Sequence, residues 1–363
     1  MTQIWVCKRF FNLFWNERVH QSDEGLWPSP EHGGQGGPSG CCRSTMKKLF
    51  ILVVFVPMLV SCRAGRNREL TGEIVAVEDA LWKVIPREAE VEHIGVGFGF
   101  TEGPAWHPDG FLVFSDIPAN LIYRRIGKGF APYRQPSGKS NGLLALKDGS
   151  LLCCEHASRS IVRYYPDGRL DTLVSRFRGS RLNSPNDLCR DARGALFFTD
   201  PPWGLDGGHE DPSKELPFAG VYRYYQGRLS LLDSTLSWPN GIALSPDNKQ
   251  LYVANYRYGN PRNTAGGQAE WLQYSLDPAG RVKDRRILFK IAAPAVPGGP
   301  DGMAVDRNGN LFVTSDEGVY ILDKTGRHLG SILLPDIPSN VCFGPRQKSL
   351  FITARTNLYR IEL

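Results

Sequence analysis

Six oxygen-bearing side chains recur along the chain, each at the head of a similar stretch of sequence. Asn and Asp are common in turns for backbone reasons alone, so one such position says little about function. Glu has no special value in a turn, however, and every one of the six positions carries a side-chain oxygen. The set therefore favours a shared ligand over six independent turns. The six residues are Glu102, Asn141, Asn186, Asn240, Asp301 and Asn340.

The chemistry of these side chains selects the kind of ligand. Carboxylate and amide oxygens suit hard divalent cations such as Ca²⁺, Mg²⁺ or Mn²⁺. The carboxylates of Glu102 and Asp301 would offset the charge of one such ion, and neutral asparagine side chains would fill its shell. A cation with open positions polarises a carbonyl and acidifies a bound water. These are the requirements of ester or lactone hydrolysis.

Other catalytic patterns are missing from the sequence. After residue 62 there is no H-E-x-x-H zinc motif. The eight cysteines include no C-x-x-C pair, which argues against a zinc site built on cysteine. His156 ends the hairpin of the second repeat and serves either a structural hydrogen bond or substrate binding. We predict substrate contacts for His156, Asp187 and Asn141, while a role in a turn stays open for Asn141 and Asn340.

Each of the six heads begins a repeated unit. The unit consists of an apolar strand, a turn with a pair such as D-G or N-G, and a second apolar strand. Six units of about 40 to 60 residues predict an all-β fold, a six-bladed β-propeller over residues 85–363. A β-sandwich or two small barrels are the alternatives, and the regular repeats argue against both. We expect residues 84–100 to add a strand to the last blade and close the ring.

A propeller explains how residues so far apart in the sequence can meet. The innermost strand of each blade runs along a central channel, so the residue at its head lies near one mouth of that channel. We therefore expect the six heads to converge in a central funnel that binds a metal.

The N-terminal region carries a different signal. Residues 46–62 read as a signal peptide, with two lysines before the short apolar run Leu49–Val60. The run ends in Leu-Val-Ser-Cys, which resembles a bacterial lipobox whose cysteine, here Cys62, is lipidated. A simple secreted form is the alternative. We interpret residues 1–45 as an over-extended, disordered N-terminus, and we expect an exported protein that is periplasmic or anchored to the membrane.

The charge of the chain limits its partners. The formal net charge is +6, and the lysines and arginines are scattered rather than clustered. Nucleic acid is therefore not an expected partner. We expect a monomer that binds a small molecule.

The motifs at the repeat heads resemble those of one known family, the gluconolactonase, regucalcin (senescence marker protein) and luciferin-regenerating enzyme group. The similarity covers roughly residues 90–363 and points to the bacterial gluconolactonase-like branch. The matching motifs are TEGPAW at 101–106, NSPNDL at 183–188, FTDPPWGL at 198–205, PNGIAL at 239–244, PDGMAVD at 300–306, and LFITA and NLYR within 350–360.

The resemblance implies a six-bladed propeller with one catalytic divalent cation and an activity on lactones. Ca²⁺ is the expected ion, with Mg²⁺, Mn²⁺ or Zn²⁺ as alternatives. In the regucalcin branch an arginine two residues before the N-D asparagine helps to bind substrate, but this chain has Ser184 there, which leaves the sugar preference open. The implied metal ligands are Glu102, Asn186, Asn240 and Asp301.

These observations predict a metal-dependent hydrolase that opens a sugar-type lactone with a metal-activated water. Asp301 is the predicted catalytic base. A carboxylate on a cation has a lowered pKa and is a weak base, so Glu102 stays an alternative. Two other hypotheses remain: hydrolysis of an aryl ester or phosphotriester at the same site, and a propeller that binds without catalysis.

Overall fold

The computed structural model of the chain describes residues 72–257, 267–292 and 299–363. The chain divides into two compact units, residues 1–63 and 64–363, and every described residue belongs to the second. The predictions for residues 1–45 and for the segment 46–62 with Cys62 lie outside the described residues. Within the described ranges, none of the helices has the length and apolar character that a membrane crossing requires.

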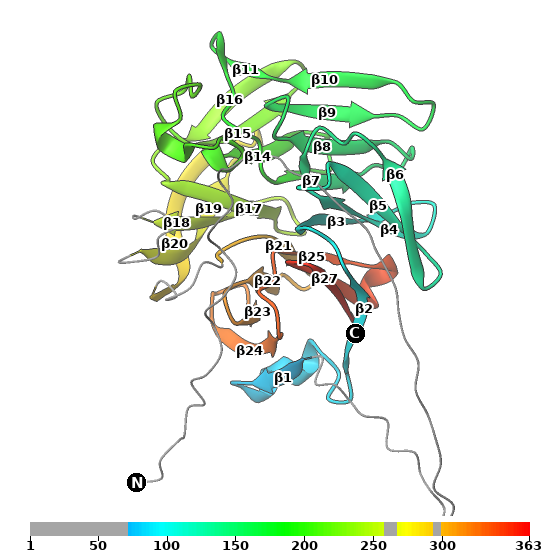
Figure 1. Ribbon diagram of the computed structural model, residues 1–363. Helices are drawn as coiled ribbons and strands as arrows, with labels where there is room; N and C mark the ends of the chain where they lie inside the picture. The colour runs from blue at the N-terminus through cyan, green and yellow to red at the C-terminus, as the bar shows by residue number, and fades with distance from the viewer. Residues whose placement is uncertain (1–71, 258–266, 293–298) are drawn as a thin grey trace, which may run out of the picture. The chain divides into compact units, whose positions relative to one another are not determined.

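Six antiparallel sheets of four or five strands surround a central channel in the described part of the chain, which confirms the predicted six-bladed β-propeller. A separate two-stranded sheet pairs β11 (Arg176–Phe177) with β12 (Ser180–Arg181). In Figure 1 the innermost strands of the blades lie around the centre of the view. These strands are β3 (Thr101–His107), β7 (Ser140–Ala145), β13 (Leu188–Arg190), β17 (Trp238–Leu244), β21 (Met303–Val305) and β25 (Asn340–Phe343).

Three further strands complete each blade, in order of distance from the channel. The second strands are β4 (Phe111–Asp116), β8 (Leu151–Glu155), β14 (Leu196–Asp200), β18 (Gln250–Arg257), β22 (Leu311–Thr314) and β26 (Ser349–Ala354). The third strands are β5 (Leu121–Ile126), β9 (Ser160–Tyr164), β15 (Gly220–Tyr225), β19 (Gln268–Leu276), β23 (Gly318–Leu322) and β27 (Asn357–Glu362). The outer strands are β6 (Gly129–Arg134), β10 (Leu170–Val174), β16 (Arg228–Asp233), β20 (Val282–Ala292), β24 (His328–Leu333) and β2 (Val91–Val96).

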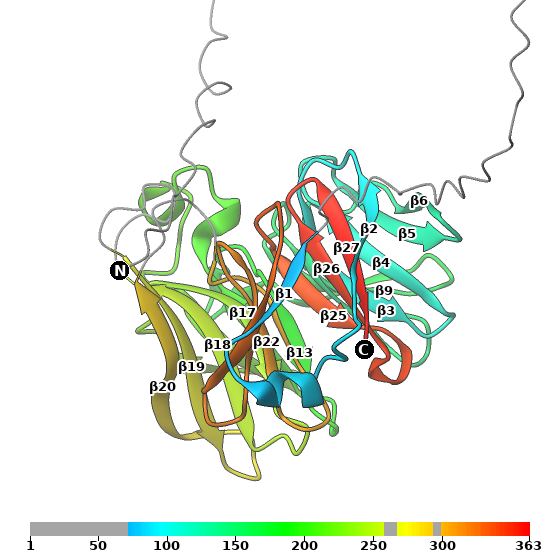
Figure 2. The ribbon, with the colours of Figure 1, turned by 90° about the horizontal axis from the view of Figure 1, so that it is seen from below.

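The ring closes by pairing two segments that are distant in the sequence. Strand β2 pairs antiparallel with β27, with Val91 opposite Ile361 and Val96 opposite Asn357. This confirms that residues 84–100 add a strand to the last blade, and Figure 2 shows β2 beside β27.

The segment before β2 also packs on the propeller. Strand β1 (Glu73–Ala76) pairs with β24, and the short helix η1 (Asp79–Lys83) follows it. Leu81 and Ile85 are fully buried in the core that blades 5 and 6 share. Residues 72–84, which precede the domain start expected from the sequence, therefore belong to the same packed structure.

Apolar side chains between neighbouring blades form the core. The adjacent residues Cys153 and Cys154 of β8 illustrate the arrangement, since successive strand residues point to opposite faces. Cys153 packs with Val113 of blade 1, whereas Cys154 packs with Phe198 of blade 3. Both are fully buried free thiols.

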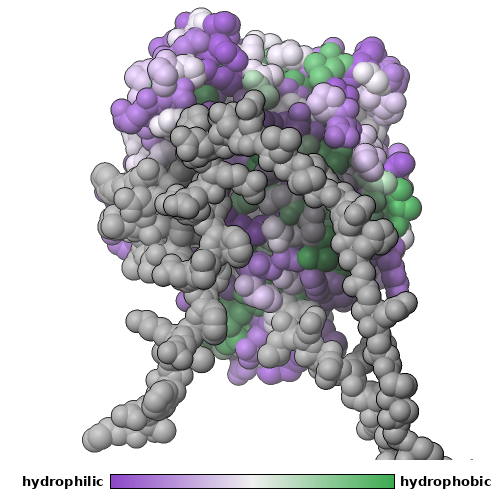
Figure 3. All heavy atoms as spheres, in the orientation of Figure 1, coloured by the Kyte–Doolittle hydropathy of each residue, from purple (hydrophilic) through white to green (hydrophobic). Residues whose placement is uncertain are grey.

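On the face in Figure 3 hydrophilic residues predominate and hydrophobic residues form separate small patches.

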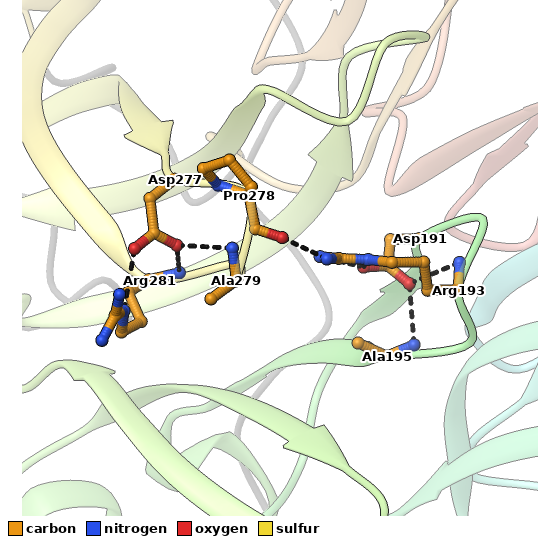
Figure 4. A network of polar contacts seen from close by, with 7 residues as sticks. All are labelled: Asp191, Arg193, Ala195, Asp277, Pro278, Ala279 and Arg281. Atoms are coloured by element: carbon orange, nitrogen blue, oxygen red, sulfur yellow. Dashed lines mark hydrogen bonds and ion pairs between the residues drawn. The ribbon is translucent and has the colours of Figure 1, made fainter.

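The hairpin turns that follow the inner strands and the third strands lie on the face of the propeller opposite the strand heads. Several of these turns carry an aspartate that accepts backbone N–H groups within its own turn, and Figure 4 shows two of them. The Asp277 carboxylate accepts from Ala279 N at 2.8 Å and from Arg281 N at 2.9 Å. Asp191 does the same in the turn of blade 3, and Arg193 of that turn donates to the Pro278 carbonyl of blade 4. These contacts fix the turns and join neighbouring blades.

Candidate functional site

The structure brings the six predicted head residues together around one mouth of the channel. Each lies within the first three residues of an inner strand or two residues before it, on blades 1 to 6 in order. Asp301 is half-buried, and the other five are buried. The convergence expected from the repeats is therefore present in the described residues.

Small residues after the heads let the inner strands approach one another closely. A Cβ atom on Gly103, which has φ +51°, would lie 2.2 Å from the Asn141 carbonyl oxygen. A Cβ on Gly302 would lie 2.0 Å from the Asn340 side chain. No real Cβ makes contacts this short, so the E-G and D-G pairs of the sequence are needed for the heads to meet.

Hydrogen bonds between blades hold the heads in place. Asn340 Nδ2 donates to Glu102 Oε2 at 3.2 Å, which joins blade 6 to blade 1. Asn240 Nδ2 donates to the Pro300 carbonyl at 3.3 Å, next to Asp301. The Asn186 carbonyl accepts from Gly142 N at 2.8 Å and so connects blades 2 and 3.

Burial raises the pKa of three carboxyl groups in this region, and the charge of a neighbouring carboxylate adds to the rise for Glu102 and Asp301. Burial raises the pKa of Glu102 to about 8, and the charge of Asp187 adds to the rise against the hydrogen bond from Gly103 N. Burial and the charge of Glu102 raise the pKa of Asp301 well above its usual value. Burial raises the pKa of Asp187 to about 6. Carboxylates in such surroundings are poorly compensated by the protein itself.

The donor set fits a hard divalent cation. Besides the crowded carboxylates, Asn240 presents a buried side-chain oxygen, Oδ1, that has no hydrogen-bond partner among the described residues. Unpaired amide oxygens and buried carboxylates are what such a cation would satisfy. No group of three or more His, Cys, Asp and Glu side chains placed to hold a metal occurs in the described ranges. The predicted ligands include only two such residues, Glu102 and Asp301, beside two asparagines.

Asp187 follows the head residue Asn186, at a position where four of the other five blades have glycine. Its side chain lines a channel cavity of about 260 Å³ below the heads, together with apolar residues such as Leu143, Ile242 and Met303. One carboxylate oxygen accepts from Leu188 N at 2.9 Å, and the other from Ile242 N at 3.4 Å. The structure therefore places this predicted substrate contact in the channel wall beside Asn186.

His156 lies beside the head of blade 2. Its Nε2 atom is 3.4 Å from Asn141 Nδ2, so the two predicted substrate contacts are neighbours. Burial, with a smaller effect of Lys139, lowers the pKa of His156 to about 4. The ring is therefore neutral near pH 7. Its other neighbour is Gly204, where an added Cβ would lie 2.6 Å from the His156 ring.

Sequence reasoning missed a basic residue at this mouth. Arg355 lies in the turn between β26 and β27, and its carbonyl accepts from Thr101 N at 2.7 Å. Its guanidinium carbon lies 5.1 Å from the centre of the Phe100 ring. Its charge lowers the pKa of Glu102 and of Asp301, against the larger effect of burial. Arg355 lies between the LFITA and NLYR motifs, and neither motif predicts a functional role for it.

Ser184 has a structural role in this chain. Its hydroxyl donates to the Pro201 carbonyl at 2.6 Å and accepts from Gly204 N at 2.8 Å. It thereby holds the turn η2 (Pro202–Gly204) against the segment that leads to Asn186.

A six-bladed propeller with a ring of oxygen-bearing side chains at one channel mouth is the structural basis for comparing this chain with known proteins. The model of the SMP-30/gluconolactonase/LRE-like region matches residues 100–356, and the chain belongs to this family. It is 36% identical to a gluconolactonase of Zymomonas mobilis over 83% of this chain and 89% of that protein.

Solved structures agree with this assignment. A gluconolactonase of Xanthomonas campestris is 34% identical, with a TM-score of 0.69 over 80% of this chain and 94% of that chain. A calcium-binding regucalcin of Agrobacterium tumefaciens is 18% identical, with a TM-score of 0.57 over 73% of this chain and 90% of that chain. The second similarity concerns the fold alone.

Proposed function

We propose that the protein is a metal-dependent lactonase that opens a sugar-type lactone at the mouth of the propeller channel. Gluconolactonase relatives, which align with most of this chain, support lactone hydrolysis. The observation that carries the proposal is the convergence of Glu102 and Asp301 with the unpaired oxygen of Asn240. This arrangement suits a divalent cation, and Ca²⁺ is the ion we expect.

Glu102, Asn186, Asn240 and Asp301 would hold the cation. When bound, it supplies positive charge that polarises the lactone carbonyl and acidifies a water. In the proposed reaction Asp301 accepts the proton of the attacking water. Its half-buried position at the mouth lets it reach both solvent and substrate. Glu102 is the alternative acceptor, because burial also raises its pKa.

The remaining residues orient the substrate. His156 is neutral near pH 7 and lies beside Asn141, so the pair can exchange hydrogen bonds with substrate hydroxyls without adding charge. Asp187 adds a third carboxylate next to Asn186, inside the channel wall. Together these groups favour a neutral, hydroxyl-bearing ring over an anionic substrate.

The test is hydrolysis of glucono-δ-lactone before and after treatment with a chelator. We expect chelation to abolish turnover and Ca²⁺, Mn²⁺ or Zn²⁺ to restore it. Full activity after exhaustive chelation would contradict metal dependence. Binding of the lactone without turnover would favour a binding module, and faster hydrolysis of aryl esters or phosphotriesters would identify the other hydrolase hypothesis.

We also propose that the protein is exported and attached to a membrane through a lipid on Cys62, as the Leu-Val-Ser-Cys sequence suggests. In a bacterial host the full chain would then fractionate with membranes. The variant Cys62→Ala would lose that association, and unchanged fractionation would contradict the proposal.

A further inference from the structure

The connection between β14 and β15 extends the mouth of the channel on one side. It spans residues 201–219, whereas the equivalent connections of blades 1, 2 and 5 span 117–120, 156–159 and 315–317. All of these connections lie on the same side as the strand heads, because successive strands of a blade are antiparallel. Blade 3 thus carries extra structure directly beside Asn186.

Contacts to three blades hold this connection in place. Arg159 of blade 2 is 4% exposed, and its Nη1 atom donates to the Ser213 carbonyl at 2.8 Å. Asn183 donates to the Phe218 carbonyl at 2.9 Å. His209 Nε2 lies 2.8 Å from the Ser237 carbonyl of the segment that enters blade 4. The connection is therefore a fixed rim of the mouth.

Trp203 lies in the turn η2 at the start of this rim. Its ring centre lies 4.5 Å from that of Trp238, two residues before the predicted ligand Asn240. The next residue, Gly204, packs against the His156 ring and is bonded to Ser184, two residues before Asn186. Trp203 thus lies beside the segments that carry Asn186 and Asn240 and, through Gly204, beside His156, the neighbour of Asn141.

The two tryptophans differ in exposure. Trp238 is 6% exposed, and His209 packs edge-on against it with ring centres 4.3 Å apart. Trp203 packs against Trp238 but is itself only half-buried. A supported aromatic ring that keeps surface at a channel mouth is suited to contact an apolar face of a ligand.

We propose that Trp203 is a specificity-determining residue that receives the C–H face of a cyclic, hydroxyl-bearing lactone. The polar edge of such a ring would lie toward His156 and Asn141, and its carbonyl toward Glu102 and Asp301. This inference rests on the proposed lactonase function, because it names the substrate class of the same site. It assigns binding to Trp203 and no part in the proton transfer.

The experiment compares Trp203→Ala, Trp203→Leu and Trp203→Phe. The probe is glucono-δ-lactam, a hydrolysis-resistant ring analogue, and binding to the calcium-loaded protein is measured by calorimetry. We expect roughly tenfold weaker binding for Ala and Leu and near wild-type binding for Phe. For glucono-δ-lactone we expect KM to rise by a similar factor, with kcat within about twofold.

Trp82→Ala is the matched control, since Trp82 lies in η1 and packs on Arg87, away from the heads. It should leave lactam binding unchanged. Wild-type lactam affinity in the folded Ala or Leu variants would overturn the proposal, and so would a Phe variant as weak as Ala. If the wild type binds the lactam but does not hydrolyse the lactone, the proposed function fails while the role of Trp203 is still measured.

Discussion

The carboxylates on the two faces of the propeller have opposite surroundings. At the hairpin ends, Asp277 and Asp323 accept backbone N–H groups within their own turns, and these hydrogen bonds contribute to lowering their pKa values. At the mouth, burial raises the pKa values of Glu102 and Asp301. A charged carboxylate therefore stabilises the fold in the hairpin turns and destabilises it at the mouth.

The direction of the pKa shift distinguishes structural from functional acidic residues, whereas the number of acidic residues in a region does not. A satisfied carboxylate in a turn needs no further partner. A buried, crowded one persists where its charged form serves a ligand or a reaction. Substitutions at the two ends should therefore affect activity and stability in opposite ways.

The largest expected effect is on activity at the mouth. Asp301→Asn removes the proposed proton acceptor and one negative charge of the cation site. We expect kcat for glucono-δ-lactone to fall by about 10² to 10⁴-fold, while the thermal midpoint is retained or rises. Stopped assays measure kcat, and a calorimetric melt measures the thermal midpoint.

Asp323→Asn at the hairpin end is the control for Asp301→Asn, because it makes the same chemical change in a turn. It should leave kcat unchanged. Equal activity in the two variants would remove Asp301 from the mechanism and leave Glu102 as the candidate base.

A second prediction concerns the pH dependence of stability in chelator-treated protein. The folded pKa of Glu102 is about 8, above its usual value of 4.5. Its contribution to stability is therefore fully present below pH 4.5 and is lost as pH rises through about 8. We expect the free energy of unfolding to decrease across this window by an amount on the order of a few kcal/mol.

Denaturant titrations at several pH values would measure this slope, and Glu102→Gln should flatten it. Added Ca²⁺ should reduce it as well, because a bound cation favours the charged form. A slope that Glu102→Gln leaves intact would assign the pH dependence to other groups.

The smallest expected effect is at the hairpin end. Asp323→Ala removes the acceptor for Thr325 N and Arg327 N and should cost about 1 kcal/mol of stability, with unchanged kcat. The folded pKa of Asp323 is lowered, so its contribution is present above its usual pKa and is lost as pH falls through the lowered value. A comparison of wild type and variant at pH 7 and pH 3 measures this difference.

The repeats made much of this architecture predictable. Alternating apolar strands and turn pairs indicated the blades, and the shared head position indicated which side chains would meet. The closing strand at 91–96 was also predictable, because an apolar segment preceded the first repeat. The ligand roles, the monomeric state and attachment through Cys62 remain predictions.

Other parts of the site depend on contacts that no local pattern encodes. The fixed rim at 201–219 is held by Arg159, which is distant in the sequence from the Ser213 carbonyl that it binds. Arg355 reaches the mouth only because the last blade closes beside the first. The raised pKa values of Glu102 and Asp301 follow from burial in the assembled ring. Such features require the tertiary structure.

The pairing of β2 with β27 also has a consequence for how the chain folds. Contacts between residues so distant in sequence carry a high loop-closure cost, and folds dominated by them form slowly. Until these strands meet, the last blade lacks its outer strand and leaves an unpaired sheet edge available to other molecules. We expect chains that lack either strand to aggregate, because the outer part of the last blade would keep an unpaired sheet edge.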